Sequence, residues 1–235
     1  MAIKGILFDK DGTLIEFNGF FGLTYLQMLQ QHFGHSPEEA LAMLVATGFV
    51  PETGTCRGGS PMASETMSQI ARRWWPDLPE SEAIARGNVM TDNFDRDAMQ
   101  KPKAVTDLAQ VFHQLTAANY LLGVATNDSE ASAHAHMTHI GVVDHFELVI
   151  GADSVAVPKP SGDMIRHFAQ VTGLAPHEIA MVGDNAHDIN EARAGGAGLA
   201  IGVLSGNSDH DDLAHIADHV IGTVADLLPL LQRLR

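Results

Sequence analysis

The sequence predicts an α/β protein that combines a doubly wound parallel sheet with an all-helical insert. Short runs of apolar and β-branched residues recur along the chain, and each run ends in a polar or glycine-containing turn. Stretches with a helical spacing of apolar residues separate most of these runs. Buried strands that alternate with helices are typical of βαβ units, which form parallel sheets. The alternation stops between about Gly19 and Met99, and this interruption predicts the insert.

The elements of the sheet domain can be assigned in chain order. The predicted strands are Ile3–Phe8, Leu121–Ala125, Phe146–Ile150, Ile179–Val182, Leu199–Val203 and His219–Val224. The predicted helices between and after them are Ala104–Asn119, Ser129–Ile140, Ser161–Thr172, Ala186–Ala194 and a closing helix at Ala225–Leu234.

The insert shows helix starts and no convincing strand. Ser36-Pro37-Glu38-Glu39 places Ser at the N-cap, Pro at the first helical position and Glu at the third, which is a capping-box pattern. Ser60-Pro61 repeats the first two of these features. We expect residues 1–17 and 101–235 to form the sheet domain and residues 18–100 to form the helical insert, with junctions at Glu16–Gly19 and Met99–Lys103.

The composition excludes several classes of protein. The 235 residues include 14 Lys and Arg and 29 Asp and Glu, which gives a net charge of −15. This charge argues against nucleic-acid and anionic-membrane partners, and no apolar run is long enough to span a bilayer. The one cysteine, Cys56, excludes a disulfide framework. We expect a protein of the reducing cytoplasm, a monomer or homodimer, whose anionic substrate would need a local positive charge.

Polar residues follow four of the predicted strands at their carboxyl ends, where open parallel sheets bind ligands. These segments are Asp9-Lys10-Asp11-Gly12-Thr13, Thr126-Asn127-Asp128, Pro158-Lys159-Pro160 and Gly183-Asp184-Asn185-Ala186-His187-Asp188. Each segment alone is ordinary turn or capping chemistry. Their convergence on one edge of one sheet predicts a functional site.

The charges of this site predict a divalent cation. Asp9, Asp11 and Asp184 would lie close together, and unpaired carboxylates at short range are costly. Mg²⁺ prefers oxygen ligands and commonly binds one or two carboxylates with waters and a substrate phosphate. Lys159 would add a second positive charge, so that a phosphate dianion could enter despite the acidic surface.

The four segments together resemble the motifs of the haloacid dehalogenase superfamily of phosphohydrolases, in the family's order. Asp9–Leu14 is similar to the first motif (DxDGT), Thr126-Asn127 to the second, Lys159-Pro160 to the third and Gly183–Asp188 to the fourth (GDxxxD). The resemblance covers the Rossmann-like core. The insert resembles the family's C1 cap, and the stretch from Lys159 to Gly206 is similar to phosphoglycolate phosphatase-like members.

The resemblance implies roles for these residues. Asp9 would form an aspartyl-phosphate, and Asp11 would act as general acid and then as general base. Mg²⁺ would be held by Asp9, the Asp11 backbone carbonyl and Asp184, with Asp188 as an occasional contact. Thr126, together with backbone N–H groups near Lys10 and Asn127, would bind the phosphoryl oxygens, and Lys159 would orient Asp9. The Lys10 side chain, which stands where many members carry an apolar residue, is expected to project away.

The substrate implied is a small phosphorylated metabolite, with phosphoglycolate as the first expectation. A sugar-phosphate or nucleotide phosphatase, a phosphomutase, and a non-catalytic metal-binding regulatory module remain alternatives. Arg57, in a polar turn of the insert, is the candidate contact to the distal group of the substrate. The other prominent polar residues are expected to be structural or solvated: His134, His136 and His139 facing solvent, Trp74-Trp75 packing, Cys56 inert and His187 without a role.

Overall fold

The computed structural model describes residues 2–16, 20–98 and 102–234. The chain divides into two compact units, of which unit 1 comprises Met1–Glu16 and Pro102–Arg235 and unit 2 comprises Phe17–Lys101. The Glu16 N–H donates to the carbonyl of Lys103 at 2.8 Å, so the chain leaves and re-enters unit 1 at neighbouring positions. Residues 17–19 and 99–101 of the predicted junctions lie outside the described residues, and the bounds of the insert stay a prediction.

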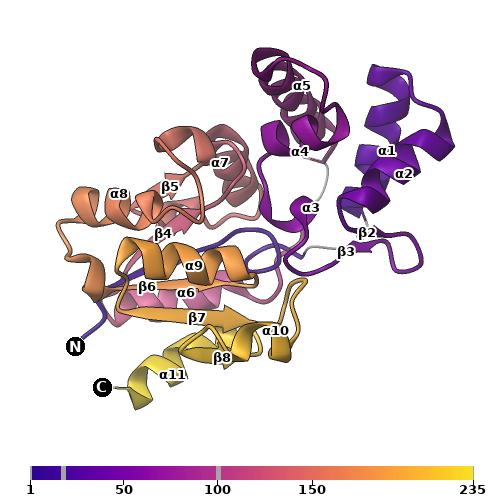
Figure 1. Cartoon of the computed structure of the whole chain (residues 1–235). Helices are drawn as coiled ribbons and strands as arrows, with labels where there is room; N and C mark the ends of the chain where they lie inside the picture. The colour runs from indigo at the N-terminus through magenta and orange to yellow at the C-terminus, as the bar shows by residue number, and fades with distance from the viewer. Residues whose placement is uncertain (1, 17–19, 99–101, 235) are drawn as a thin grey trace. The chain divides into compact units, whose positions relative to one another are not determined.

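Unit 1 contains a six-stranded, entirely parallel sheet, as predicted (Figure 1). Its strand order is β5-β4-β1-β6-β7-β8. The strands are β1 (Gly5–Phe8), β4 (Leu121–Ala125), β5 (Leu148–Ile150), β6 (Ile179–Gly183), β7 (Leu199–Val203) and β8 (His219–Ile221). The chain winds outward from β1 to β5, then returns to the other side of β1 and winds outward to β8. The switch point of this doubly wound sheet therefore lies between β1 and β6.

Side chains alternate in direction along each strand, so apolar strands present apolar side chains on both faces of the sheet. Helices cover both of these faces. Ile6 and Phe8 of β1 pack toward α6 (Leu108–Ala117), α7 (Glu130–His139) and α11 (Leu227–Arg233). Leu7 packs on the opposite face, toward α8 (Asp163–Thr172), α9 (Ala186–Gly195) and α10 (His210–Ala214). Single 3₁₀ turns lie at Val143–His145, Ala152–Ser154, Pro176–Glu178 and Val224–Asp226.

Unit 2 is mainly helical and has its own apolar core. Its helices are α1 (Phe20–Phe33), α2 (Pro37–Ala46), α3 (Pro61–Ser64), α4 (Met67–Trp74) and α5 (Glu80–Ala98). The predicted capping box forms at α2, where the Ser36 hydroxyl accepts from the Glu39 N–H and the Glu39 carboxylate accepts from the Ser36 N–H. Trp74 is buried in this core and donates its indole N–H to the Met43 carbonyl at 2.8 Å, so its expected packing role is confirmed.

The expectation that the insert contains no strand is wrong. A two-stranded hairpin joins β2 (Phe49–Val50) to β3 (Thr55–Cys56). Each strand has only two residues, too few to produce a period-two pattern in the sequence. The helix expected after Ser60-Pro61 is a single turn, and the Ser60 hydroxyl makes no capping bond there.

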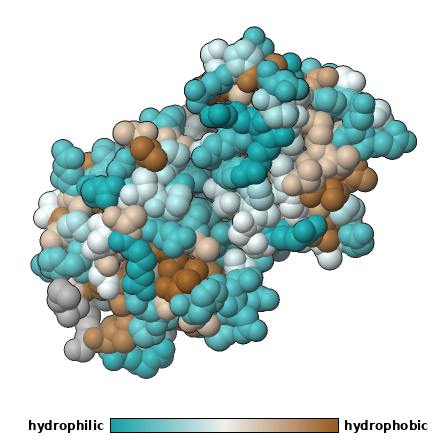
Figure 2. Space-filling view, in the orientation of Figure 1, coloured by the Kyte–Doolittle hydropathy of each residue, from teal (hydrophilic) through white to brown (hydrophobic). Residues whose placement is uncertain are grey.

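Most large apolar side chains are buried in the cores of the two units, and the hydropathy of the surface agrees with this. On the face drawn in Figure 2, hydrophilic residues predominate and apolar ones form small separate groups. Within the described residues, no helix is long and apolar enough to cross a membrane.

Candidate active site

The predicted polar segments do gather at the carboxyl edge of the sheet. Asp9 directly follows β1, and its N–H donates to the carbonyl of Val182 in β6 at 2.8 Å. Thr126 directly follows β4, and its N–H donates to the carbonyl of Ile150 in β5 at 3.0 Å. Because both residues still take part in the strand hydrogen bonding, their positions are fixed by the sheet.

Lys159 joins two of the predicted carboxylates. Its ammonium donates to Oδ1 of Asp9 and to Oδ1 of Asp188, both at 2.6 Å, and the three side chains are almost completely buried. Burial alone would lower the pKa of Lys159, but the two carboxylates raise it above its usual range, so the side chain stays charged. Lys159 lies 150 positions from Asp9 and 29 positions from Asp188 in the sequence, and the fold brings the three side chains into one ion-paired centre.

The loop that carries Lys159 is held from two sides. The Asn127 side chain accepts from the Lys159 N–H at 3.1 Å and donates to the Lys159 carbonyl at 3.2 Å. Glu191, which the sequence did not single out, accepts from the N–H groups of Gly162 and Met164 at 2.6 and 2.9 Å. This carboxylate, fully buried on α9, therefore caps the start of α8 directly after the Lys159 loop.

Asp184, at the end of β6, lies against the turn that follows Asp11. Gly12 has a φ of +84°, and a Cβ at this position would lie 2.6 Å from Oδ2 of Asp184, so a residue larger than glycine does not fit. Oδ2 of Asp184 accepts from the Asn207 N–H at 2.8 Å, and the Ser205 hydroxyl donates to the Gly12 carbonyl at 2.7 Å. The loop after β7 therefore contributes to this edge of the sheet, in addition to the four segments that the sequence pattern indicated.

The expectation that the Lys10 side chain projects away is wrong. This side chain is fully buried, and its ammonium lies 2.5 Å from Oδ2 of Asp11 and 2.8 Å from Oδ2 of Asp128. Burial raises the pKa of Asp11 to about 7, against the opposing effect of Lys10 and with a further contribution from Asp128. A carboxyl group with a pKa near neutrality is suited to both donating and accepting a proton.

The three carboxylates around Lys159, which belong to Asp9, Asp184 and Asp188, would carry more negative charge when ionised than this one lysine can balance. Burial raises the pKa of Asp9, and Asp188 raises it further. Burial also raises the pKa of Asp184 well above its usual range, and Asp9 and Asp188 add to this effect. A hard divalent cation would relieve this repulsion and match the oxygen donors, so the residues present fit Mg²⁺.

His187, to which the sequence assigned no role, belongs to this cluster. One ligand atom each from Asp9, His187 and Asp188 lie within 4.8 Å of one another. Burial lowers the pKa of His187 to about 3, and Lys159 contributes to the same direction, so the imidazole is neutral. The sequence feature that could have predicted this place of His187 is its position inside the GDxxxD segment, next to Asp188.

Other predicted residues lie elsewhere or behave differently from the expectation. Arg57 is exposed and belongs to unit 2, so its proximity to the substrate stays a prediction. His134 and His139 are exposed as expected, but His136 is 3% exposed, because it lies on the face of α7 that also buries Ser132 and Met137. Cys56 is buried, and burial raises the pKa of its thiol to about 12, in agreement with an inert residue.

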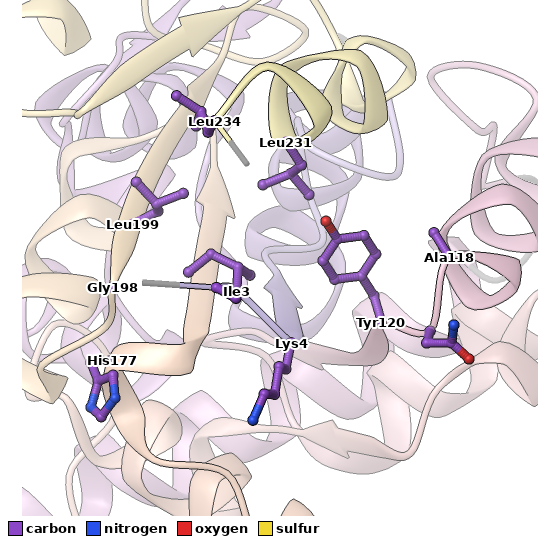
Figure 3. A pocket seen from close by; sticks show the side chains of 11 residues that line it. Ile3, Lys4, Ala118, Tyr120, His177, Gly198, Leu199, Leu231 and Leu234 are labelled. Atoms are coloured by element: carbon purple, nitrogen blue, oxygen red, sulfur yellow. The ribbon is translucent and has the colours of Figure 1, made fainter.

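A pocket of about 870 Å³ lies at the opposite, amino edge of the sheet (Figure 3). Ile3, Tyr120 and Leu199 line it, and Lys4 at its margin pairs with Glu178 at 2.6 Å. Of the residues predicted for the site, none is among its lining residues. The pocket is therefore separate from the carboxylate cluster.

Comparison with known proteins agrees with this geometry. A family model described as haloacid dehalogenase-like hydrolase matches residues 3–196. A protein of Chromobacterium violaceum named phosphoglycolate phosphatase is 39% identical over 237 aligned residues, which cover 98% of this chain and 97% of that one. A protein of Neisseria meningitidis with the same name is 28% identical over 98% of this chain and 94% of its own length.

Solved structures share the fold. An HAD phosphatase from Thermococcus onnurineus has a TM-score of 0.66 at 23% identity and covers 97% of this chain and 98% of its own. CbbY from Rhodobacter sphaeroides, solved in complex with phosphate, has a TM-score of 0.69 at 21% identity over 96% of each chain. The protein is an enzyme of the phosphatase type, and it belongs to the haloacid dehalogenase-like hydrolase family.

Proposed function

We propose that this phosphatase is a Mg²⁺-dependent phosphomonoester hydrolase that acts through an aspartyl-phosphate on Asp9. The observation that carries the proposal is the environment of Asp9: it is buried at the carboxyl end of β1, ion-paired with Lys159 and close to Asp188. Asp9, the backbone carbonyl of Asp11 and Asp184 would hold the metal ion, with Asp188 beside them. When bound, Mg²⁺ supplies positive charge that stabilises the phosphoryl oxygens.

In the first step, a carboxylate oxygen of Asp9 attacks phosphorus, and the bond between phosphorus and the substrate alcohol oxygen breaks. Protonated Asp11 gives its proton to that leaving oxygen. The Thr126 hydroxyl and the N–H groups of Lys10 and Asn127 bind the phosphoryl oxygens. Lys159 holds Asp9 in place and offsets the charge that develops during transfer.

In the second step, Asp11, now a carboxylate, takes a proton from water. The water oxygen attacks phosphorus, and the bond between phosphorus and Asp9 breaks. Phosphate leaves, while Asp9 returns to its carboxylate and Asp11 to its acid form. The pKa of Asp11, raised to about 7 by burial, supports both of its roles.

We further propose phosphoglycolate as the substrate and Arg57 as the contact to its distal carboxylate. The names of the relatives support the substrate. Replacing Arg57 with Ala should raise KM for phosphoglycolate about tenfold or more, through the loss of one charge-assisted hydrogen bond. The substitution should leave kcat/KM for an ester without a carboxylate unchanged. An unchanged KM for the preferred ester would remove Arg57 from the site.

The test of the reaction is phosphate release from a panel of phosphomonoesters, with and without Mg²⁺, by the wild type and by Asp9→Asn. The proposal predicts Mg²⁺-dependent release that Asp9→Asn abolishes, with phosphoglycolate preferred. Preference for a sugar phosphate or a nucleotide would correct the substrate alone. The absence of release from every ester by folded, Mg²⁺-loaded protein would contradict the hydrolase and favour a mutase or a binding module.

A further inference from the structure

The ion-paired cluster on the β4 side of the site contains a charge that the proposed mechanism does not use. Lys10 lies between the two aspartates of the first motif in sequence, and its side chain is fully buried. Its ammonium contacts Oδ2 of Asp11 at 2.5 Å and Oδ2 of Asp128 at 2.8 Å. A buried lysine is costly unless it is paired, and the contacts with the two aspartates offset this cost.

The two carboxylates differ in how they are anchored. Asp128 belongs to the turn that follows β4, where its N–H donates to the Thr126 hydroxyl at 3.2 Å. Asp128 therefore contacts the Lys10 ammonium from the side of β4, through a turn that its own backbone hydrogen bond fixes.

The two oxygens of the Asp11 carboxyl group differ in their contacts. Oδ2 is bound to Lys10, and Asp128 also lies within hydrogen-bonding reach of the Asp11 side chain. Oδ1 is buried and has no hydrogen-bond partner among the residues that the structure describes. A carboxyl group that is fixed at one oxygen keeps its orientation, and its second oxygen has no competing partner within the described residues. This asymmetry is what a residue that exchanges a proton with the substrate needs.

We propose that Lys10 is a positioning residue that fixes Asp11 through Oδ2, with Asp128 as its counter-ion, and directs Oδ1 of Asp11 toward the leaving oxygen. The proposal rests on the proposed function, because it assumes that Asp11 exchanges the proton. It adds two residues, Lys10 and Asp128, whose side chains had no role in that mechanism. The N–H of Lys10 keeps its separate role in phosphate binding.

A purely structural ion pair would have different consequences. If Lys10 served only to neutralise Asp128, its removal would lower stability and reduce turnover of all esters by a similar factor. If Lys10 positions Asp11, the loss depends on the leaving group. An alkoxide needs the proton that Asp11 gives, whereas a 4-nitrophenolate leaves readily without one.

The first measurement compares kcat/KM for phosphoglycolate and for 4-nitrophenyl phosphate in the wild type, Lys10→Met and the control Lys4→Met, all with Mg²⁺. Lys10→Met should reduce kcat/KM about 30-fold or more for the alkyl ester and less than about threefold for the aryl ester. Lys4 is an exposed lysine that pairs with Glu178 on the amino edge, so its variant should match the wild type for both esters. Equal losses for the two esters in Lys10→Met would overturn the proposal.

The second measurement separates stability from positioning and does not depend on the aryl ester. Lys10→Met leaves Asp128, whose side chain is 32% exposed, without its cationic partner, and Asp128→Asn added to it removes that charge. The double variant should regain melting temperature relative to Lys10→Met but not kcat/KM for the alkyl ester. Recovery of both quantities would show a structural pair and contradict the proposal.

Failure of the inference is distinguishable from failure of the proposed function. A wild type without Mg²⁺-dependent phosphate release would contradict the hydrolase itself. A wild type that is active, together with a Lys10→Met variant that keeps the wild-type kcat/KM for the alkyl ester, would contradict only the role of Lys10.

Discussion

At the scale of single residues, the site is organised by two buried lysines that each bridge two carboxylates. Lys159 joins Asp9 to Asp188, and Lys10 joins Asp11 to Asp128. In an enzyme with a net charge of −15, these ammonium groups are local sources of positive charge at the edge where an anionic substrate would bind. Because they are shielded from solvent, their effect on neighbouring groups is stronger than that of surface lysines.

Replacement of Lys159 by Met should lower kcat about 100-fold or more, because it removes the charge that orients Asp9. Steady-state kinetics with saturating Mg²⁺ would measure this effect, with near-ultraviolet circular dichroism as the check of folding. Lys4→Met, an exposed lysine on the opposite edge, serves as the matched control and should retain wild-type kcat. A kcat for folded Lys159→Met within threefold of the wild type would be incompatible with the assigned role.

His136 should make the free energy of unfolding depend on pH. Burial lowers its folded-state pKa to about 4, Lys10 and His139 act in the same direction, and Asp128 opposes them. An unfolded histidine titrates near pH 6.5. Between these values the unfolded chain binds the proton and the folded chain does not, so stability is complete above pH 6.5 and is lost as pH falls toward 4.

Between pH 7.5 and pH 5.5, this single group should cost about 1 kcal/mol of unfolding free energy. Urea titrations of the wild type and His136→Leu at the two pH values would measure it, because the other groups cancel in the comparison. His134→Leu, which replaces an exposed histidine of the same helix, should keep the wild-type pH dependence. The same pH dependence in His136→Leu as in the wild type would refute the assignment.

At the scale of elements, the loop that carries Lys159 depends on a contact between two helices. The N-cap residue of α8, Gly162, has no side chain, and Glu191 of α9 accepts the N–H groups of Gly162, Met164 and Ile165 instead. The Asn127 side chain holds the other end of this segment at the Lys159 peptide. Correct placement of Lys159 thus requires α9 and the β4 turn as well as its own loop.

Removal of this cap by Glu191→Ala should lower the free energy of unfolding by about 3 kcal/mol, because it leaves buried N–H groups without acceptors. Chemical denaturation would measure the change. Glu147→Ala, at an exposed glutamate of unit 1, should stay within about 0.5 kcal/mol of the wild type. A Glu191→Ala variant as stable as Glu147→Ala would argue against the capping role.

Much of this arrangement could be predicted from the sequence, and the failures have physical causes. The strands Leu121–Ala125 and Leu199–Val203 were predicted with their observed bounds, because buried strands are continuous apolar runs. The β2–β3 hairpin was missed because two-residue strands show no periodicity. His136 and Lys10 were misplaced because residue type predicts exposure only on average. His136 lies on the buried face of α7, and Lys10 is held by ion pairs with Asp11 and Asp128.

At the scale of the whole molecule, the winding of the sheet accounts for the location of the site. The chain reverses its direction of winding at β1, so the loops after β1 and β6 diverge and leave their strand ends accessible. Asp9 directly follows β1, and Asp184 directly follows β6. The insertion point, where Glu16 meets Lys103, belongs to the segment that follows the first motif.

The most direct test of the aspartyl-phosphate mechanism is to map the phosphoryl group during turnover. Wild-type enzyme with Mg²⁺ and ³²P-labelled phosphoglycolate would be quenched in acid within milliseconds, reduced with borohydride and mapped by mass spectrometry, with Asp9→Asn as the control. The proposed mechanism predicts a label that hydroxylamine removes, a reduced residue at position 9, and neither label nor phosphate release in Asp9→Asn. A label on another residue, or phosphate release that Asp9→Asn retains, would contradict it.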